Sequence, residues 1–420
     1  MKRDPILNSE KRPDLPVWAR DNAFPPAGDG YGWIDSRGRR HQCTGLEDLA
    51  DVIRNDRKSA VLLIWTPESA HCRIPEEIKA FKSSITQVRR QWVADDLEES
   101  QQRLKWFGAS LVILIAYLAF QGWKHAKSIE LANGVSLTLN EELRWILGSL
   151  LRSTTVGIAL LGFLVFAFIP WYQARKKSSE LKARSKRAGP IVPLIRFEIW
   201  LDTQKAPVTW ILLGLITMVA LAQLVFTNSV HDVGLVKTAY RSGEFWRLFT
   251  APMLHGGFLH YFMNAMALLY LGKRVEVFAR WPHVPMVFLF SAIVAGEASV
   301  RFTDATSVGA SGGLMGWLGF LLVFETLHSS LVPKSAKRRL IGGVVMTALI
   351  GLIGYRFIDN AAHFGGLIAG MGYAAIVFPK SASVARPKMN LVDKTVGALS
   401  MVFIMLCAAF TIYKMAGGFG

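Results

Sequence analysis

The sequence predicts an all-α membrane protein that crosses the bilayer about nine times, with a small cytosolic α+β domain at its N-terminus. Three observations lead to this prediction. Apolar residues gather in blocks of about 18–25 residues with few charges, which is the length that an α-helix needs to span a bilayer. Lys and Arg concentrate between alternate blocks. The first hundred residues are polar and contain no such block.

The expected spans, with bounds accurate to a few residues, are 106–123, 145–171, 206–226, 258–279, 284–300, 311–328, 338–355, 361–379 and 396–414. Lys and Arg crowd residues 1–105 and 172–205 and recur in every second loop after that. Basic loops stay on the cytoplasmic side, so we expect a cytoplasmic N-terminus and an outer C-terminus. This pattern also explains the net charge of +17, and no nucleic-acid partner is expected.

Residues 1–105 are expected to form a soluble accessory domain. "GLEDLADVIRND" has the spacing of an amphipathic helix, and "AVLLIWTP" is typical of a buried strand ended by proline. A long polar helix then leads to the first span. No apolar segment typical of a signal peptide is present in this region. A partner-binding role and a passive stabilising role are both open.

The cysteines of this region suggest little chemistry. Cys43 and Cys72 each have a histidine nearby, but adjacent His71 and Cys72 could hardly both reach one zinc ion. We therefore expect reduced thiols, no disulfide framework, no metal and no cofactor.

Further along, the chain divides into four parts. Residues 106–171 form two extra transmembrane helices, 172–205 a basic cytosolic linker, 206–379 a core and 380–420 a linker with an additional transmembrane helix. Polar residues appear inside the spans only from about residue 206. Ionisable residues at membrane depth are energetically costly, so those in the core are candidate functional residues.

The candidate nucleophile is Ser311. The segment Gly309-Ala310-Ser311-Gly312-Gly313 fits the G-x-S-x-G pattern of a serine on a tight turn, directly before an apolar run. A serine hydroxyl needs a base within about 2.6–3.2 Å to take its proton. His363, near the start of another span, is the candidate base.

Small residues predict that these two helices approach closely. The face of the serine helix has Gly312, Gly316 and Gly319, and the face of the histidine helix has Gly366, Gly370 and Ala374. Such faces permit close backbone contact in lipid. We therefore predict a Ser311–His363 catalytic dyad.

The developing oxyanion also needs hydrogen-bond donors. The backbone N–H of Ser311 lies at a helix N-terminus, which favours negative charge. His260 and Asn264 are four residues apart on one helix face and are the candidate side-chain donors. No carboxylate is required. Asp359 could orient His363, but a helix N-cap in "DNAAH" is the favoured interpretation.

The depth of Ser311 indicates the substrate. The helix from Ser311 to His328 is roughly 27 Å long, which is less than the hydrocarbon thickness of about 30 Å. Anchored at the cytosolic face, this helix begins below the outer surface. The target bond is therefore expected inside the membrane, with water entering from outside through a polar cavity.

From about 206 to 379 the chain resembles the rhomboid intramembrane serine proteases. The matching motifs are "GEFWRLFT", "LHGGFLHYFMN", "YLGKRVE", "GASG" and "AHFGG", in the same order on successive spans. The resemblance implies a six-helix protease core, a Ser311–His363 dyad and His260 with Asn264 near the oxyanion. It further implies structural roles near the site, which fall to Trp246, Arg247, His255, Gly309, Gly312, Gly366 and Gly370.

One residue departs from the family pattern. Many members have an aromatic residue four positions after the serine, where this chain has Met315. Methionine fills similar space, so we expect a change in rate and no loss of activity. The helix at 396–414 is similar to that of members with one helix added after the core, whereas the two extra spans and the accessory domain are unusual.

The sequence therefore predicts an intramembrane serine endopeptidase that cuts transmembrane segments of membrane proteins near the outer face of a bacterial cytoplasmic membrane. A soluble α/β-hydrolase is excluded by the continuous apolar blocks. A transporter is disfavoured because the two halves of the chain show no repeat. The open alternative is a catalytically silent rhomboid-like protein that binds or escorts membrane clients, although such a protein would be expected to lack Ser311 or His363.

Overall fold

The computed structural model describes residues 15–56, 60–134, 136–184, 192–355 and 358–418. The chain forms two compact units. The N-terminal unit contains residues 24–192 together with 348–358. The core unit contains residues up to 23, then 193–347 and 359–420.

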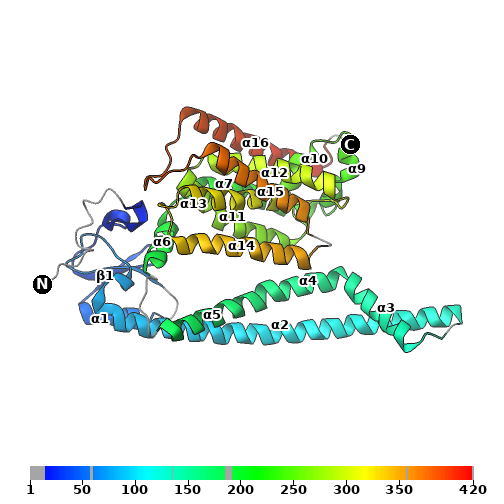
Figure 1. Ribbon diagram of the computed structural model, residues 1–420, viewed down its shortest axis with the longest axis horizontal. Helices are drawn as coiled ribbons and strands as arrows, with labels where there is room; N and C mark the ends of the chain where they lie inside the picture. The colour runs from blue at the N-terminus through cyan, green and yellow to red at the C-terminus, as the bar shows by residue number, and fades with distance from the viewer. Residues whose placement is uncertain (1–14, 57–59, 135, 185–191, 356–357, 419–420) are drawn as a thin grey trace. The chain divides into compact units, whose positions relative to one another are not determined.

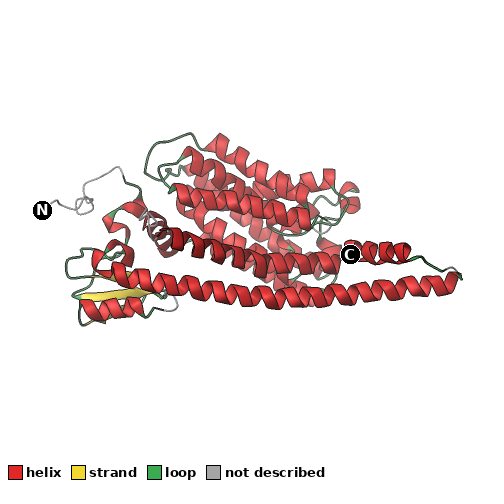
Figure 2. Ribbon diagram, turned by 60° about the horizontal axis from the view of Figure 1, so that its bottom comes forward, coloured by secondary structure: helices red, strands yellow, loops and turns green. Residues whose placement is uncertain are grey.

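The N-terminal unit begins with a three-stranded antiparallel sheet in the order β2-β1-β3. Its strands are β1 (Tyr31–Asp35), β2 (Arg40–Cys43) and β3 (Val61–Trp65), and α1 (Leu46–Arg54) follows β2. Figure 2 shows that, within the described residues, strands occur in this sheet and the rest is helix and loop. The predicted helix and the predicted strand of the accessory domain are both present, at α1 and β3.

A small apolar core explains why these elements fold together. Leu49 and Ile53 on one face of α1 are buried against Ile64 of β3 and Phe81. The β1–β2 turn is fixed by Asp35, whose carboxylate accepts backbone N–H groups at 2.8 and 2.9 Å. The apolar stripe of α1 and the continuous apolar run of β3 therefore meet in one core, as the residue pattern requires.

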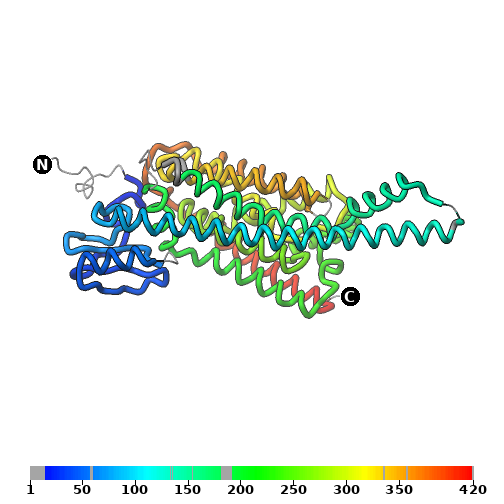
Figure 3. Tube along the Cα trace, turned by 90° about the horizontal axis from the view of Figure 1, so that it is seen from below, coloured from blue at the N-terminus to red at the C-terminus, as the bar shows by residue number. Residues whose placement is uncertain are grey.

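A helical hairpin follows the sheet in this unit. It contains α2 (Lys82–Asn133), α3 (Leu139–Arg152), α4 (Thr154–Phe163), a π-helical turn (Leu164–Phe168) and α5 (Ile169–Arg184). The helix α2 is continuous over 52 residues, and Figure 3 shows α5 returning alongside it. The predicted polar helix and the first expected span are thus one element.

The second expected span, 145–171, differs from the structure. The chain breaks at Ser153, whose side chain caps α4 by accepting the N–H of Val156 at 3.4 Å. The segment before the break, α3, is a separate helix with its own capping box at Thr138 and Glu141. The apolar stretch that could cross a membrane is Thr155–Glu180. The prediction placed this span too early because apolar residues on one face of α3 extend the apolar block toward the N-terminus.

The core unit is a bundle of long helices (Figure 1). Its helices are α6 (Val192–Thr203), α7 (Pro207–Val225), α11 (Phe258–Ala279), α12 (His283–Phe302), α13 (Ser311–Leu327), α14 (Lys334–Ile353), α15 (Asn360–Val377) and α16 (Leu391–Met415). The loop between α7 and α11 contains the short helices α8 (Ser229–Val233), α9 (Lys237–Arg241) and α10 (Arg247–Thr250). Within the described residues, 3₁₀ turns lie at Val17–Ala19, Asp21–Ala23, Pro75–Glu77, Lys79–Phe81 and Ala251–Met253.

The short helix α13 is the centre of the bundle. It packs against α11, α12 and α15, and most of its side chains are buried. Glu276 of α11 accepts the backbone N–H groups of Val208 and Thr209 and so caps the start of α7. The C-terminal helix α16 packs against α12 and α7.

The expected start of the accessory domain also differs. Residues 15–23 belong to the core unit, where the indole Nε1 of Trp18 donates to the carbonyl of Leu331 at 2.8 Å. Arg196 of α6 donates to the carbonyl of Trp18 at 2.9 Å. The expected accessory domain 1–105 therefore loses its first residues to the core. In the expected linker 172–205 the described residues are largely helical, while 185–191 lie outside the described residues.

Five described helices are long and apolar enough to cross a membrane, namely Lys79–Ala132, Thr155–Glu180, Pro207–Val225, His283–Phe302 and Leu391–Met415. The apolar helix Ser311–Leu327 is shorter. These helices identify a membrane protein with several spans. The count of nine stays a prediction.

Candidate active site

The serine lies at the first residue of α13, directly after a tight turn. Gly309 has φ +123°, in the region that favours glycine, and its N–H donates to the carbonyl of Ala251 at 2.9 Å. Before it, Ser307 and Leu235 exchange two backbone hydrogen bonds of 3.0 and 3.2 Å. The turn that presents Ser311 is therefore attached at two points to the α7–α11 loop.

The histidine lies in the first turn of α15. Asp359 is the N-cap of this helix, since its Oδ1 accepts the N–H of Ala362 at 2.9 Å. The N–H of His363 donates to the carbonyl of Asp359 at 3.1 Å. The favoured interpretation of "DNAAH" as a helix cap is thus confirmed. Nδ1 of His363 is buried and, among the described residues, has no hydrogen-bond partner.

Glycine brings the helices of Ser311 and His363 into backbone contact. A methyl group built on Gly366 would lie 2.1 Å from the carbonyl oxygen of Gly312, and one on Gly370 would lie 1.8 Å from that of Gly316. A methyl group on Gly319 would lie 2.1 Å from the carbonyl oxygen of Leu367. Real Cβ atoms do not come so close, so α13 and α15 can pack in this way only with glycine at these positions.

His260 and Asn264 are directed at the serine turn. A methyl group on Gly309 would lie 2.6 Å from Cε1 and 2.8 Å from Nε2 of His260, and 3.8 Å from Nδ2 of Asn264. Asn264 is fixed by donating from Nδ2 to the carbonyl of His260 at 2.9 Å. Two possible donors therefore border the space beside Gly309, two residues before Ser311.

His255 is buried next to His260, with 5.3 Å between their ring centroids. Its backbone is held by Gln223 of α7, which accepts its N–H at 2.8 Å and donates to its carbonyl at 3.0 Å. Tyr261 packs edge-on to His255 and shares a 2.8 Å hydrogen bond with Thr217 of α7. These contacts tie the start of α11 to α7. Gln223 was not among the predicted site residues, although a glutamine inside an apolar span was an available signal.

The Trp246-Arg247 pair holds the α7–α11 loop together. Arg247 donates to the carbonyl of Gly234 at 2.8 Å and pairs with Glu244 at 2.7 Å. Its guanidinium lies 4.7 Å from the ring of Trp246, which Lys414 of α16 approaches to 5.0 Å. The loop is thus braced internally and against the C-terminal helix.

Several residues outside the predicted set also border the site. Lys237, which the sequence shows only as a loop charge, and Ser299 are buried, and Ser307 is half-buried. The hydroxyls of Ser299 and Ser307 each contact both the ammonium of Lys237 and the carboxylate of Asp359. No local pattern distinguishes them, because they come from separate segments. Met315 is buried one turn after Ser311.

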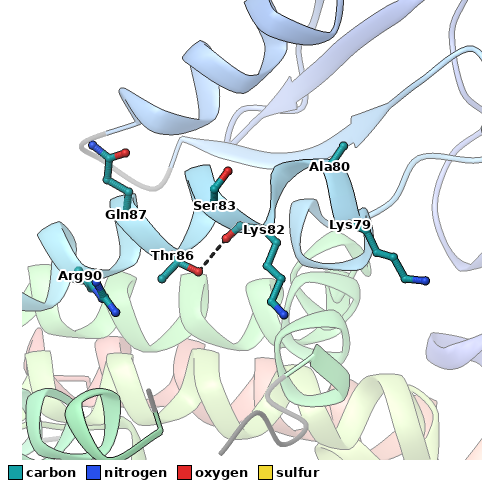
Figure 4. A pocket seen from close by; sticks show the side chains of 7 residues that line it. All are labelled: Lys79, Ala80, Lys82, Ser83, Thr86, Gln87 and Arg90. Carbon is teal, nitrogen blue, oxygen red and sulfur yellow. Dashed lines mark hydrogen bonds between the residues drawn. The ribbon is translucent and has the colours of Figure 1, made fainter. Parts of the chain in front are cut away.

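A shallow hollow lies far along the chain from these residues, in the N-terminal unit. Figure 4 shows it at the start of α2, lined by Lys79, Lys82 and Arg90 with hydroxyl groups of Ser83 and Thr86. Thr86 Oγ1 donates to the backbone carbonyl of Lys82 at 2.7 Å. The hollow contains none of the candidate catalytic residues.

Comparisons with known proteins point to one family. Residues 242–380 match the model of the Rhomboid domain. The chain is 34% identical over 155 residues to "Rhomboid protease GluP" of Bacillus subtilis (strain 168), covering 36% of this chain and 30% of that protein. It is 33% identical over 151 residues to "RHOMBOID-like protein 6, mitochondrial" of Arabidopsis thaliana, covering 34% of this chain and 48% of that protein.

A further relative is matched over most of its own length. The chain is 27% identical over 165 residues to "Putative rhomboid protease YdcA" of Bacillus subtilis (strain 168), covering 37% of this chain and 82% of that protein. By contrast, the chain spans less than half the length of the first two relatives, Rhomboid protease GluP and RHOMBOID-like protein 6. In all three cases the aligned part is about a third of this chain.

Proposed function

Because the chain belongs to the rhomboid family, we propose that it is an intramembrane serine endopeptidase with Ser311 as nucleophile and His363 as general base. The observation that carries this proposal is the glycine contact between α13 and α15. It brings the helix that starts at Ser311 against the helix that carries His363 in its first turn.

The proposed reaction follows from this arrangement. Ser311 Oγ attacks the carbonyl carbon of a peptide bond while the imidazole of His363 accepts the hydroxyl proton. The oxyanion is stabilised by the N–H of Ser311 and by the side chains of His260 and Asn264. His363 then protonates the leaving amine, and an ester to Ser311 remains. Water, deprotonated by His363, hydrolyses this ester and releases the acid product and free serine.

The proposed substrates are transmembrane segments of single-pass or other membrane proteins, cut near the outer face of the bilayer. This follows from the short length of α13, which begins below one surface if its other end is at the opposite surface. We place the protein in a bacterial cytoplasmic membrane with its N-terminus in the cytoplasm and its C-terminus outside. Met315, in place of the usual aromatic residue, is expected to change the rate without abolishing cleavage.

Labelling with a serine-directed fluorophosphonate probe tests this function directly. The purified protein in detergent should be labelled, and Ser311→Ala and His363→Ala should each abolish both labelling and cleavage of a single-pass substrate. The double variant should be no worse than either single variant, because members of a catalytic unit are not additive. Ser329→Ala, an exposed serine beyond the other end of α13, is the matched control and should label normally.

The alternative is a catalytically silent protein that binds or escorts membrane clients. It requires that the wild-type protein folds, retains a client and gives neither labelling nor cleavage. Substantial cleavage by Ser311→Ala would contradict the proposed mechanism. The two results separate a silent protein from an enzyme that uses another nucleophile.

A further inference from the structure

A buried lysine in the α7–α11 loop is satisfied by two serines. The side chain of Lys237 is almost completely buried, with 1% of the residue exposed. Its ammonium donates to Ser299 Oγ at 2.5 Å, to Ser307 Oγ at 2.8 Å and to the carbonyl of Leu235 at 3.4 Å. Burial lowers the pKa of Lys237 to about 8, and the Asp359 carboxylate opposes this shift. A charged group so deeply buried is tolerated only with partners of this kind.

The same two hydroxyls lead on to a carboxylate. Ser299 and Ser307 both donate a hydrogen bond to Oδ2 of Asp359. Each hydroxyl therefore accepts a hydrogen bond from the ammonium of Lys237 and donates one to the carboxylate of Asp359. The other oxygen of Asp359, Oδ1, caps α15 through the N–H of Ala362. Both oxygens of Asp359 therefore have fixed partners, and the cap of the helix is coupled to Lys237.

The network joins four segments that are distant in the sequence. Lys237 belongs to α9, Ser299 to α12, Ser307 to the turn before α13, and Asp359 to the N-cap of α15. Ser307 is four residues before Ser311, and Asp359 is four residues before His363. The turn that presents the nucleophile and the helix that presents the base are thus attached to one pair of opposite charges, the buried Lys237 and the half-buried Asp359, through the bridging serines.

We propose that Lys237 and Asp359, bridged by Ser299 and Ser307, are positioning residues that set the mutual placement of Ser311 and His363. This inference rests on the proposed dyad. Neither residue touches the substrate. Their effect is on alignment, so loss of the network is expected to slow the chemical step more than it weakens substrate binding.

The test uses Lys237→Met, which keeps the length of the side chain and removes its donors. We expect kcat on a single-pass substrate and the fluorophosphonate labelling rate to fall on the order of 10- to 100-fold, with KM changing much less. Arg241→Met, at the other end of the same short helix, is the matched control. Arg241 contacts Asp304 and the carbonyl of Val300 outside the network, and its variant should stay within about twofold of wild type.

A double variant separates alignment from stability. Lys237→Met leaves the carboxylate of Asp359 without its counter-charge, whereas Lys237→Met/Asp359→Asn removes both charges, and asparagine can still cap α15. We expect the double variant to recover thermal stability while kcat stays low. Recovery of kcat together with stability would overturn the positioning role. The double variant also keeps the test valid if Lys237→Met alone does not fold.

The outcomes distinguish this inference from the proposed function. If the wild-type protein labels at Ser311 and Lys237→Met labels equally fast, the network has no positioning role and the proposed enzyme stands. If the wild-type protein does not label at all, the proposed function itself fails.

Discussion

Gly370 of α15 lies with its Cα directly against the backbone of Gly316 of α13, so closely that a methyl group on Gly370 would come within 1.8 Å of the Gly316 carbonyl oxygen. The obstacle is backbone, which cannot rotate away as a flexible side chain can. The separation of the serine and histidine helices is therefore set by the absence of side chains at this contact.

The first prediction concerns this contact. Gly370→Ala should push α15 away from α13, with a loss of stability of about 1–3 kcal/mol and a fall in cleavage of more than about tenfold. Gly372→Ala is the control on the same helix, because a methyl group there meets nothing within 4 Å. Thermal unfolding and cleavage are measured for both variants. Equal thermal stability and equal cleavage rates of the two variants would show that the close approach of α15 to α13 affects neither stability nor activity.

The second prediction concerns the oxyanion donors. His260→Ala and Asn264→Ala should each reduce cleavage on the order of 100-fold, less than the complete loss expected for Ser311→Ala. KM should change little, since these donors act on charge that develops in the transition state. Cleavage of the single-pass substrate at several concentrations measures kcat and KM for each variant. A variant with unchanged kcat would remove that residue from the oxyanion site.

The third prediction concerns topology. A reporter fused after Lys205 should report the cytoplasm, and one fused after Gly420 should report the outer compartment, because the basic segments mark the inner side. Reporter activity on each side of the membrane measures this. A C-terminus on the cytoplasmic side would mean a miscounted span, with the stretches 106–123 and 145–171 the first to re-examine.

The fourth prediction concerns pH and the accessory sheet. The backbone N–H of Arg39, with His41 and the N–H of Arg37, lowers the pKa of Asp35 from 3.8 to about 2. A lowered folded-state pKa stabilises the fold above pH 3.8, and this contribution is lost as the pH falls toward 2. The β1–β2 hairpin should therefore become open to pepsin between about pH 4 and 2.

Variants check the assignment to this carboxylate. Asp35→Asn should make the hairpin sensitive across the whole acid range, with peptides over 31–43 identified by mass spectrometry. Asp51→Asn, an exposed position on α1, is the control and also corrects for the pH profile of pepsin. Unchanged resistance in Asp35→Asn would show that other groups hold the turn.

The fifth prediction concerns the substrate. A transmembrane helix hides its carbonyl groups in hydrogen bonds, so a local stretch must unwind before Ser311 can attack. A substrate span with Gly or Pro a few residues from its outer end should be cut faster than an all-Leu span, because these residues weaken the helix. Small residues such as Ala or Gly should be favoured at the cut. If the all-Leu span is cut equally fast, unwinding does not limit the rate.

Local patterns in the chain were enough to predict a helical membrane protein with several spans and to nominate the residues of the candidate site. Hydropathy and charge are properties of short segments, so the apolar helices and the basic loops could be recognised one at a time. The glycine spacing around Ser311 and His363 predicted close helix approach because residues three and four apart share a face. The cap at Asp359 followed from the type of residue before α15.

Other features depended on which segments meet in the folded chain. Lys237 was counted as a loop charge, since nothing near it in the sequence shows that Ser299, Ser307 and Asp359 surround it. The break at Ser153 and the association of Trp18 with the core had the same cause. Whether a polar group is buried depends on partners that lie far away in the sequence. The contacts of Lys237 and the other polar residues around the site could therefore be identified only from the packed helices.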